Sequence, residues 1–182
     1  FLGNIQPDLQ MDVARLTISA EYIVSDTMNL WIDMSPDKVG EVLAISSVFL
    51  LNHEEAFQFT GTNDIPDAAN QLHAAGPDIV VIKMGADGSY LSFKDGAFFV
   101  PVFPVEKVVD PTGAGDSFAG GFLGCLAQME KPDFIEAVLT GSAVASFGVE
   151  NFGPESLLNV TRKNLDGRIA SIRDRLFAAE GA

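Results

Sequence analysis

The sequence predicts one α/β domain in which a mostly parallel sheet is flanked by helices on both faces, giving three layers. Short apolar runs alternate with helical patterns and turn signals along the 182 residues, which is the order expected of βα units. The run Ile79–Ile82 contains only β-branched residues, as in a strand buried on both faces of a parallel sheet. The Gly-rich segment Asp110–Gly115 leads into an almost wholly apolar helical pattern. These features together predict a Rossmann-like arrangement.

Pro and Gly set the predicted ends of the helices in the first half of the chain. Pro7 and Pro36 each open a helical pattern, because Pro is tolerated in the first helical turn. Gly76-Pro77 closes another such pattern, since Gly is favoured just after the last helical residue. The predicted strands are 1–5, 21–24, 47–51 and 79–82, and the predicted helices are 7–16, 36–45, 53–59 and 65–75.

The second half is predicted to open with a β-hairpin near residues 89–100 and to continue mostly as helix. Asp95-Gly96 lies between two alternating apolar runs, which is a strong hairpin signal. The hairpin strands are predicted at 89–93 and 97–100, a further strand at 105–109, and helices at 117–129 and 134–147. A last helix carries Leu165, Ile169, Ile172 and Leu176 on one face, and the basic residues around that stripe are predicted to form a solvated face.

Composition and charge exclude several classes of protein. Eleven basic against 25 acidic residues give a net charge of −14, which argues against a nucleic-acid partner because phosphate-backbone affinity rests on clustered Lys and Arg. The single Cys125 cannot form an internal disulfide, so nothing indicates an oxidising compartment. The longest nearly apolar run, Val42–Leu51, is about half the length of a membrane span. We therefore expect a cytoplasmic protein with no membrane partner.

The loop between Asp110 and the following helix is the segment most informative about chemistry. Gly113, Ala114 and Gly115 are small, so the backbone can approach a ligand closely and turn several N–H groups the same way. These groups precede a helix, where unpaired donors and the helix dipole favour an anion such as phosphate. Local dipoles would thus supply the attraction for a nucleotide that the net charge does not.

Asp116 follows this loop and has two interpretations. A carboxylate at a helix start is favoured as an N-cap, so the residue can be purely structural. Alternatively, it faces the same site and accepts a proton from an attacking hydroxyl, a role that suits phosphoryl transfer. The residues alone leave the two interpretations open.

Three known loop patterns can be compared with this segment, and none of them matches it fully. The dinucleotide fingerprint requires Gly where Phe118 stands, and the P-loop requires a Gly-Lys-Ser/Thr sequence that does not follow these glycines. The segment around Ser117 nearly matches the nucleophile elbow of α/β-hydrolases. Those enzymes need a His after the Ser, and both histidines here, His53 and His73, precede Ser117.

The segment Asp110–Leu123 resembles the second signature of the ribokinase-like, or PfkB, sugar and nucleoside kinases, including its Gly-Ala-Gly-Asp core. Asn52-His53-Glu54-Glu55 resembles the Asn-x-x-Glu element of the family. Lys83–Gly88 resembles the segment where a strand turns over the nucleotide, and Val149–Gly153 resembles the wall of the adenine pocket. The resemblance implies a ribokinase-like fold and ATP-dependent transfer of a phosphoryl group to a hydroxyl of a small sugar or nucleoside, with a sugar kinase favoured.

The resemblance also implies a role for each matching residue. Asp116 would be the catalytic base, and the backbone of Gly113, Ala114 and Gly115 would form the anion hole. The residues implied along the nucleotide and its phosphates are Asn52, Lys83, Gly85, Gly88 and Ser142. Glu55 would order Mg²⁺ through water. Asp110 and Thr112 match positions that bind a monovalent cation such as K⁺ in some members.

Each of these residues also has a structural interpretation. Asn52 can satisfy backbone groups in a turn, Glu55 can be an acid at a helix start, and Lys83 can extend from a strand end. Gly85 and Gly88 can serve only a turn. The order of these residues across the predicted sheet, together with the signature, favours the functional interpretation.

The chain is expected to be the C-terminal, nucleotide-binding and catalytic part of such a kinase. Residues 1–182 contain no match to the lid or to the Gly-Gly element that holds the acceptor in the first half of the family's chains. We therefore expect the N-terminal part and lid to be absent and the isolated chain to phosphorylate poorly. The expected partner is a small sugar or nucleoside, and a homo-oligomer is possible. The alternative to a kinase is a non-catalytic nucleotide-binding or interaction module that retains the fold.

Overall fold

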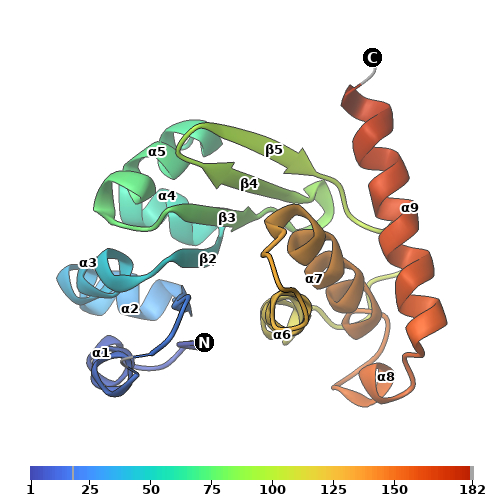
Figure 1. Ribbon diagram of the computed structural model, residues 1–182, viewed down its shortest axis with the longest axis horizontal. Coiled ribbons are helices and arrows are strands. Elements are labelled where there is room, and N and C mark those ends of the chain that lie inside the picture. The colour runs from blue at the N-terminus through green and yellow to red at the C-terminus, as the bar shows by residue number, and fades with distance from the viewer. Residues whose placement is uncertain (18, 181–182) are drawn as a thin grey trace. The chain divides into compact units, whose positions relative to one another are not determined.

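The computed structural model describes residues 1–17 and 19–180 of the chain (Figure 1). The chain separates into two compact units. Unit 1 consists of Phe1–Gly85 and Tyr90–Phe98, and unit 2 consists of Ala86–Ser89 and the chain from Phe99 onward.

A five-stranded sheet, most of it in unit 1, follows the chain order β1-β2-β3-β4-β5. The strands are β1 Val24–Asp26, β2 Val48–Asn52, β3 Ile79–Lys83, β4 Ser89–Phe93 and β5 Gly96–Val100. The first three are parallel, and Asn52 at the end of β2 is in register with Lys83 at the end of β3. The two-residue turn Lys94-Asp95 joins β4 to β5, so the predicted hairpin is confirmed. The parallel strands and the hairpin make a mixed sheet.

The helices of unit 1 bury a continuous apolar core against β2 and β3. They are α1 Pro7–Leu16, α2 Asn29–Met34, α3 Pro36–Ile45, α4 His53–Thr60 and α5 Ile65–Ala75. Alternate strand residues Phe49, Leu51, Val80 and Ile82 face this core, because successive side chains of a strand point to opposite faces. The helices contribute Ile32, Val39, Val42, Leu43, Ala56, Ala68, Ala69 and Leu72. Each large side chain buried in this way stabilises the fold by about 1.5–3 kcal/mol relative to exposure.

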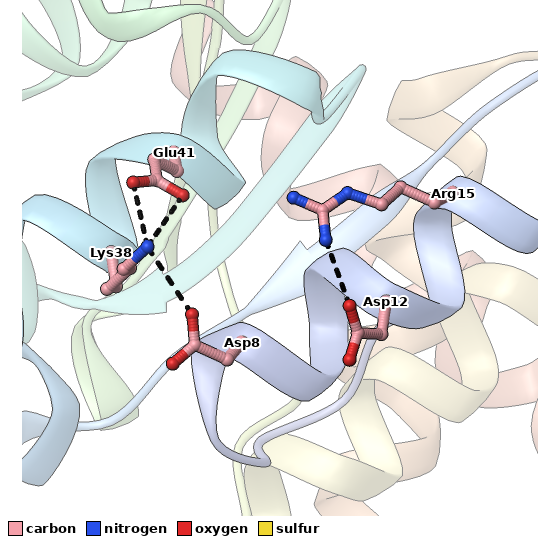
Figure 2. Close-up of polar contacts among 5 residues, drawn as sticks. All are labelled: Asp8, Asp12, Arg15, Lys38 and Glu41. Atoms are coloured by element: carbon pink, nitrogen blue, oxygen red, sulfur yellow. Dashed lines mark hydrogen bonds and ion pairs between the residues drawn. The ribbon is translucent and has the colours of Figure 1, made fainter.

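One ion pair on the surface of unit 1 links α1 to α3, and two others lie within single helices (Figure 2). The Lys38 ammonium lies 3.0 Å from a Glu41 carboxylate oxygen and 3.5 Å from one of Asp8. The hydrogen bond to Glu41 and the charges of both carboxylates raise the pKa of Lys38. Arg15 pairs with Asp12 at 2.9 Å. All five side chains are exposed, so these pairs add little stability, and apolar contacts hold the unit together.

Unit 2 is mainly helical, with α6 Ala114–Leu126, α7 Phe134–Gly148, α8 Glu155–Leu158 and α9 Arg162–Glu180. Helices α6 and α7 approach closely at two glycines. A Cβ at Gly121 would lie 3.0 Å from the Gly141 Cα, and a Cβ at Gly141 would lie 2.8 Å from the Phe118 carbonyl oxygen. The absence of side chains at these positions therefore sets the spacing of the two helices.

Several predicted elements differ in the structure. The predicted strand 1–5 is reduced to one parallel bridge between Leu2 and Ser25, because the chain bends at Asn4-Ile5. The predicted strand 21–24 is displaced to Val24–Asp26, and the short helices α2 and α8 were not predicted. Helices α1, α3 and α5 have the predicted bounds.

The strand predicted at 105–109 is wrong, and the following helix begins earlier than expected. Residues 101–110 contain no strand, and the Val109 N–H donates to the carbonyl of Val149 rather than to a strand (2.8 Å). Pro101 and Pro104 have no N–H to give to a sheet. Helix α6 begins at Ala114 and ends at Leu126, where 117–129 was predicted. None of the helices in the described part of the chain has the length and apolar character needed to cross a bilayer.

Candidate active site

In unit 1, the predicted phosphate-site residues lie at the carboxyl ends of two parallel strands, where open α/β sheets bind ligands. Asn52 ends β2 and is the N-cap of α4. Its Oδ1 accepts from the Glu55 N–H at 2.8 Å, and the Glu55 Oε2 accepts from the Asn52 N–H at 2.8 Å. This reciprocal capping box fixes both side chains. Because Lys83 is in register with Asn52, the strands bring three predicted residues to one edge.

Glu55 is unusual among these residues because its side chain is buried, with 7% of the residue exposed. Burial raises the pKa of its carboxyl, while the Asn52 hydrogen bond and the charge of Lys83 oppose the rise. A buried carboxylate with few partners is costly. Capping a helix does not by itself require a buried acid beside a lysine. The N-caps of α5 and α7, Asp64 and Asp133, are exposed and act without a reciprocal acid.

The two predicted glycines of the turn after β3 differ in their surroundings. Gly85 has φ +60 and begins the 3-10 turn η1 Gly85–Asp87, and a Cβ there would meet nothing within 4 Å. Gly88 belongs to unit 2, has φ +101, and a Cβ there would lie 2.3 Å from the Val100 carbonyl oxygen. The structure therefore gives Gly88 a packing requirement of its own, and leaves open space beside Gly85.

In unit 2, the Gly-rich loop ends in a helix start with free donors. Gly113 is the N-cap of α6 in the left-handed conformation, φ +75 and ψ 6. The Ala114 N–H, predicted as part of the anion hole, instead donates to the Pro111 carbonyl at 3.1 Å, and the Ser117 N–H donates to the Gly113 carbonyl at 2.9 Å. The N–H groups of Gly113, Gly115 and Asp116 have no acceptor within the described part of unit 2. Such a cluster at a helix N-terminus is an anion-binding arrangement.

Asp116 does not cap the helix. Because α6 begins at Ala114, Asp116 is its third residue, and no side chain caps this helix. Asp116 is exposed, and its carboxylate makes no hydrogen bond or ion pair with any residue that the structure describes. The structural interpretation of Asp116 as an N-cap is therefore wrong, and its carboxylate is available beside the free donors.

The predicted monovalent-cation residues form the start of this loop. The Asp110 Oδ1 accepts from the Thr112 N–H at 2.9 Å, and this bond lowers the pKa of Asp110. The N–H groups of Val109 and Asp110 both donate to the Val149 carbonyl, at 2.8 and 3.3 Å. Unit 2 thus joins the start of the Gly-rich loop directly to the predicted adenine wall at Val149–Gly153. Ser142 lies within α7 and is buried, 5% exposed.

Two residues at strand ends were not predicted. Thr27 directly follows β1 and is 7% exposed, and His53 directly follows β2. The Thr27 Oγ1 and the His53 Nδ1 are buried without a hydrogen-bond partner among the described residues, which is uncommon for buried polar atoms. The available sequence signal was their position close after predicted strands.

The residues present fit a magnesium–nucleotide ligand. In unit 2, the N–H groups of Gly113, Gly115 and Asp116, which have no acceptor in the described part of that unit, suit phosphate oxygens. In unit 1, taken by itself, Lys83 places a positive charge at the strand edge. Among the described residues there is no cluster of three or more His, Cys, Asp or Glu side chains that would hold a metal. Mg²⁺ commonly takes one or two carboxylates and completes its shell with water and substrate phosphates, so a single carboxylate such as Glu55 suffices.

An open α/β sheet with polar side chains at its strand ends is the usual frame of a ligand-binding α/β protein. A helix N-terminus with free donors, as at α6, is an arrangement that suits an anion. The pfkB family of carbohydrate kinases matches residues 8–161. The chain belongs to this family.

Known relatives agree with this assignment. Aminoimidazole riboside kinase of Salmonella typhimurium is 30% identical over 79% of this chain and 47% of its own length. The 1-phosphofructokinase of Haloferax volcanii is 30% identical over 95% of this chain and 56% of its own. The chain therefore spans about half the length of these relatives.

Solved structures confirm the ribokinase-like fold. Aminoimidazole riboside kinase from Salmonella enterica is 29% identical with a TM-score of 0.75, and covers 88% of this chain and 56% of its own. The Methanocaldococcus jannaschii nucleoside kinase, a member of the ribokinase family, is 25% identical with a TM-score of 0.75, and covers 93% of this chain and 55% of its own.

Proposed function

We propose that this chain carries the ATP–Mg²⁺ site and the catalytic base of a kinase that phosphorylates a hydroxyl of a small sugar or nucleoside. The observation that carries the proposal is the start of α6. Three N–H groups there are without acceptors in unit 2, and the exposed Asp116 carboxylate, free of any capping bond, belongs to the same helical turn. A donor cluster for the phosphoryl group and a base for the acceptor hydroxyl are two of the parts used in phosphoryl transfer to a hydroxyl.

Each residue has a defined task in this proposal. Asp116 accepts the proton of the acceptor hydroxyl as that oxygen bonds to the γ-phosphorus and the bond to the ADP oxygen breaks. The N–H groups of Gly113, Gly115 and Asp116 stabilise the negative charge on the transferred group. When bound, Mg²⁺ neutralises phosphate charge and orients the nucleotide.

The side chains of unit 1 would order the phosphates and the metal. The Asn52–Glu55 capping box holds the Glu55 carboxylate in one orientation, which suits a water-mediated contact to Mg²⁺. Lys83 would lie along the nucleotide phosphates, with Gly85 leaving space for it. The relatives support a nucleotide donor, since one solved structure of aminoimidazole riboside kinase is complexed with its riboside and an ATP analogue.

The acceptor is proposed only as a class. Relatives act on riboses, ribosides and sugar phosphates by their names: ribokinase, aminoimidazole riboside kinase and 1-phosphofructokinase. No residue of this chain is assigned to an acceptor, and the chain spans about half the length of those relatives. We accordingly expect slow transfer by the chain to ribose, fructose or adenosine.

The test combines Asp116→Asn with nucleotide titration and phosphotransfer from γ-labelled ATP. Wild type and D116N should both release heat with ATP–Mg²⁺, with dissociation constants similar to one another. Transfer should fall by about 10²–10⁴-fold in D116N, the usual contribution of a general base. Full transfer by D116N would remove Asp116 from catalysis. No heat with wild-type protein would favour a module that does not bind nucleotide.

A further inference from the structure

Helix α9 begins at Arg162, after the family match ends at residue 161. Arg168 of this helix reaches the C-terminal end of α7. Its two terminal nitrogens donate separately, Nη1 to the Ser146 Oγ and Nη2 to the Glu150 Oε2, each at 2.7 Å. One guanidinium thus connects a residue inside α7 with a residue just beyond it.

The Arg168 guanidinium also contacts two aromatic rings. Its Cζ lies 3.5 Å from the ring centre of Phe147 and 4.4 Å from that of Phe103. The Arg168 side chain is only 14% exposed. The prediction that the basic residues of this helix form a solvated face is therefore wrong at Arg168, where ion pairing and two ring contacts outweigh hydration.

These contacts surround Val149, the residue that holds the start of the Gly-rich loop. Phe147 lies two residues before Val149 and Glu150 directly after it, and the Val149 carbonyl accepts from the N–H groups of Val109 and Asp110. Asp110 in turn accepts from the Thr112 N–H, one residue before the Gly113 N-cap of α6. A continuous series of contacts therefore runs from Arg168 through the end of α7 to the loop.

Helix α9 holds the segment before the loop at a second point. The Arg175 Nη1 donates to the Val102 carbonyl at 3.1 Å, one residue before Phe103, which lies against Arg168. Residues 101–110 contain no strand, so these contacts and the Val149 carbonyl replace the sheet that would otherwise fix this segment.

We propose that Arg168 is a positioning residue for nucleotide binding: it fixes the end of α7 and, through Val149, the loop that begins at Asp110. The proposal rests on the proposed function for the identity of the ligand. Arginine is required because its planar group can donate to two acceptors while it stacks on rings, whereas a lysine ammonium cannot do both.

The chain offers a matched control. Arg173, also in α9, pairs with Glu136 in the first turn of α7, at the opposite end of that helix from Val149. Arg168→Met and Arg173→Met each break one ion pair of α9, with Glu150 just beyond α7 and with Glu136 inside α7 respectively, and each leaves one glutamate without that partner. Only R168M removes a group next to the residues that hold the loop.

The experiment measures ATP–Mg²⁺ affinity by calorimetry and amide exchange in the full chain for wild type, R168M, R168K and R173M. In R168M, the dissociation constant should rise about tenfold, within the range of remote coupling effects. The amides of Val109 and Asp110 should exchange faster, while that of the buried Leu139 in α7 stays protected. R168K should lie between wild type and R168M, and R173M should match wild type in both readouts.

Two results would overturn the proposal. Equal loss of affinity in R168M and R173M would reduce Arg168 to a general stabilising role, as would faster exchange throughout α7 in R168M. Unchanged affinity and unchanged Val109 exchange in R168M would remove it from the site altogether. If wild type fails to bind ATP–Mg²⁺, the proposed function fails first, and the exchange data then show separately whether Arg168 holds the loop.

Discussion

The Glu55 side chain makes a capping hydrogen bond, but burial makes its negative charge costly. Its Oε2 caps the Asn52 N–H, while burial raises the pKa of its carboxyl above the ordinary 4.5. With a raised pKa, the folded protein binds the proton more tightly than the unfolded chain does. The contribution of Glu55 to folding is therefore fully present below pH 4.5 and is lost as the pH rises through the folded pKa.

Glu55→Gln should separate these two effects. The amide oxygen can still accept from the Asn52 N–H, but the buried charge is gone. At pH 7, the free energy of unfolding of E55Q should equal or exceed that of wild type, and this advantage should shrink as the pH falls towards 4.5. Urea unfolding at several pH values measures it, and ATP–Mg²⁺ affinity should fall in the same variant.

The neighbouring Glu54→Gln is the control, because Glu54 is exposed and makes no capping bond. Its effect on stability should depend far less on pH. A loss of stability in E55Q that is the same at pH 7 and pH 4.5 would mean that the carboxylate acts through its hydrogen bond rather than its charge.

Gly113 is needed for its backbone conformation. Its φ of +75 is left-handed, and a Cβ there would meet nothing within 4 Å, so Gly113→Ala should cost about 1–2 kcal/mol from conformational strain alone. Gly120→Ala, inside α6 with ordinary φ and equal space, should instead stabilise by about 0.5–1 kcal/mol. Urea unfolding checks both. Equal effects at the two positions would exclude strain at Gly113.

For single residues, the sequence predicted the position correctly where that position depends on neighbours along the chain. Asn52 and Glu55 are separated by the spacing of a capping box, and the motif placed them correctly at a strand end. The start of α6 was not predictable, because Gly113 and Gly115 have low helix propensity. The unpartnered Thr27 Oγ1 and His53 Nδ1 depend on burial, which a local pattern does not supply.

Among the elements, α6 and α7 show how missing side chains determine helix packing. Gly121 and Gly141 face one another, and neither position has room for a Cβ. This brings the two backbones close together, and α6 carries Asp116 while α7 leads to Val149. The relative placement of the proposed base and the loop anchor within unit 2 therefore depends on these glycines.

Gly141→Ala should destabilise unit 2. The new Cβ would lie 2.8 Å from the Phe118 carbonyl oxygen, which is backbone and cannot rotate away. Overpacking of this kind costs about 1–3 kcal/mol. Gly124→Ala on α6 has open space and should be neutral or slightly stabilising. Thermal unfolding compares the two, and a G141A variant as stable as G124A would show that the helices separate easily.

The sequence predicted elements well where the apolar pattern and its turn signals agree. The strand at Ile79 and the helices opened by Pro7 and Pro36 have nearly the predicted bounds. The segments 1–5 and 105–109 were predicted as strands but have no continuous strand partner in the structure. Pairing is a property of distant segments, so a local pattern cannot decide it.

For the whole molecule, the family and fold were predictable because one long signature fixed them. The match to the pfkB family over residues 8–161 confirms the family. The prediction of one domain stays a prediction, and so does the role of the chain as the catalytic part of a longer kinase. The net charge of −14 is compatible with the proposal, because local dipoles such as the free N–H groups at the start of α6 can attract phosphate where the net charge does not.

The division into units has a consequence for synthesis. The chain passes between them at Gly85–Ala86, Ser89–Tyr90 and Phe98–Phe99. Unit 1 is therefore complete only after Phe98 has left the ribosome, and by then the first four residues of unit 2, Ala86–Ser89, have already been made. No single cleavage of the backbone separates the units into two whole fragments. A truncation after Gly85 removes the β4–β5 hairpin and cannot yield an intact unit 1.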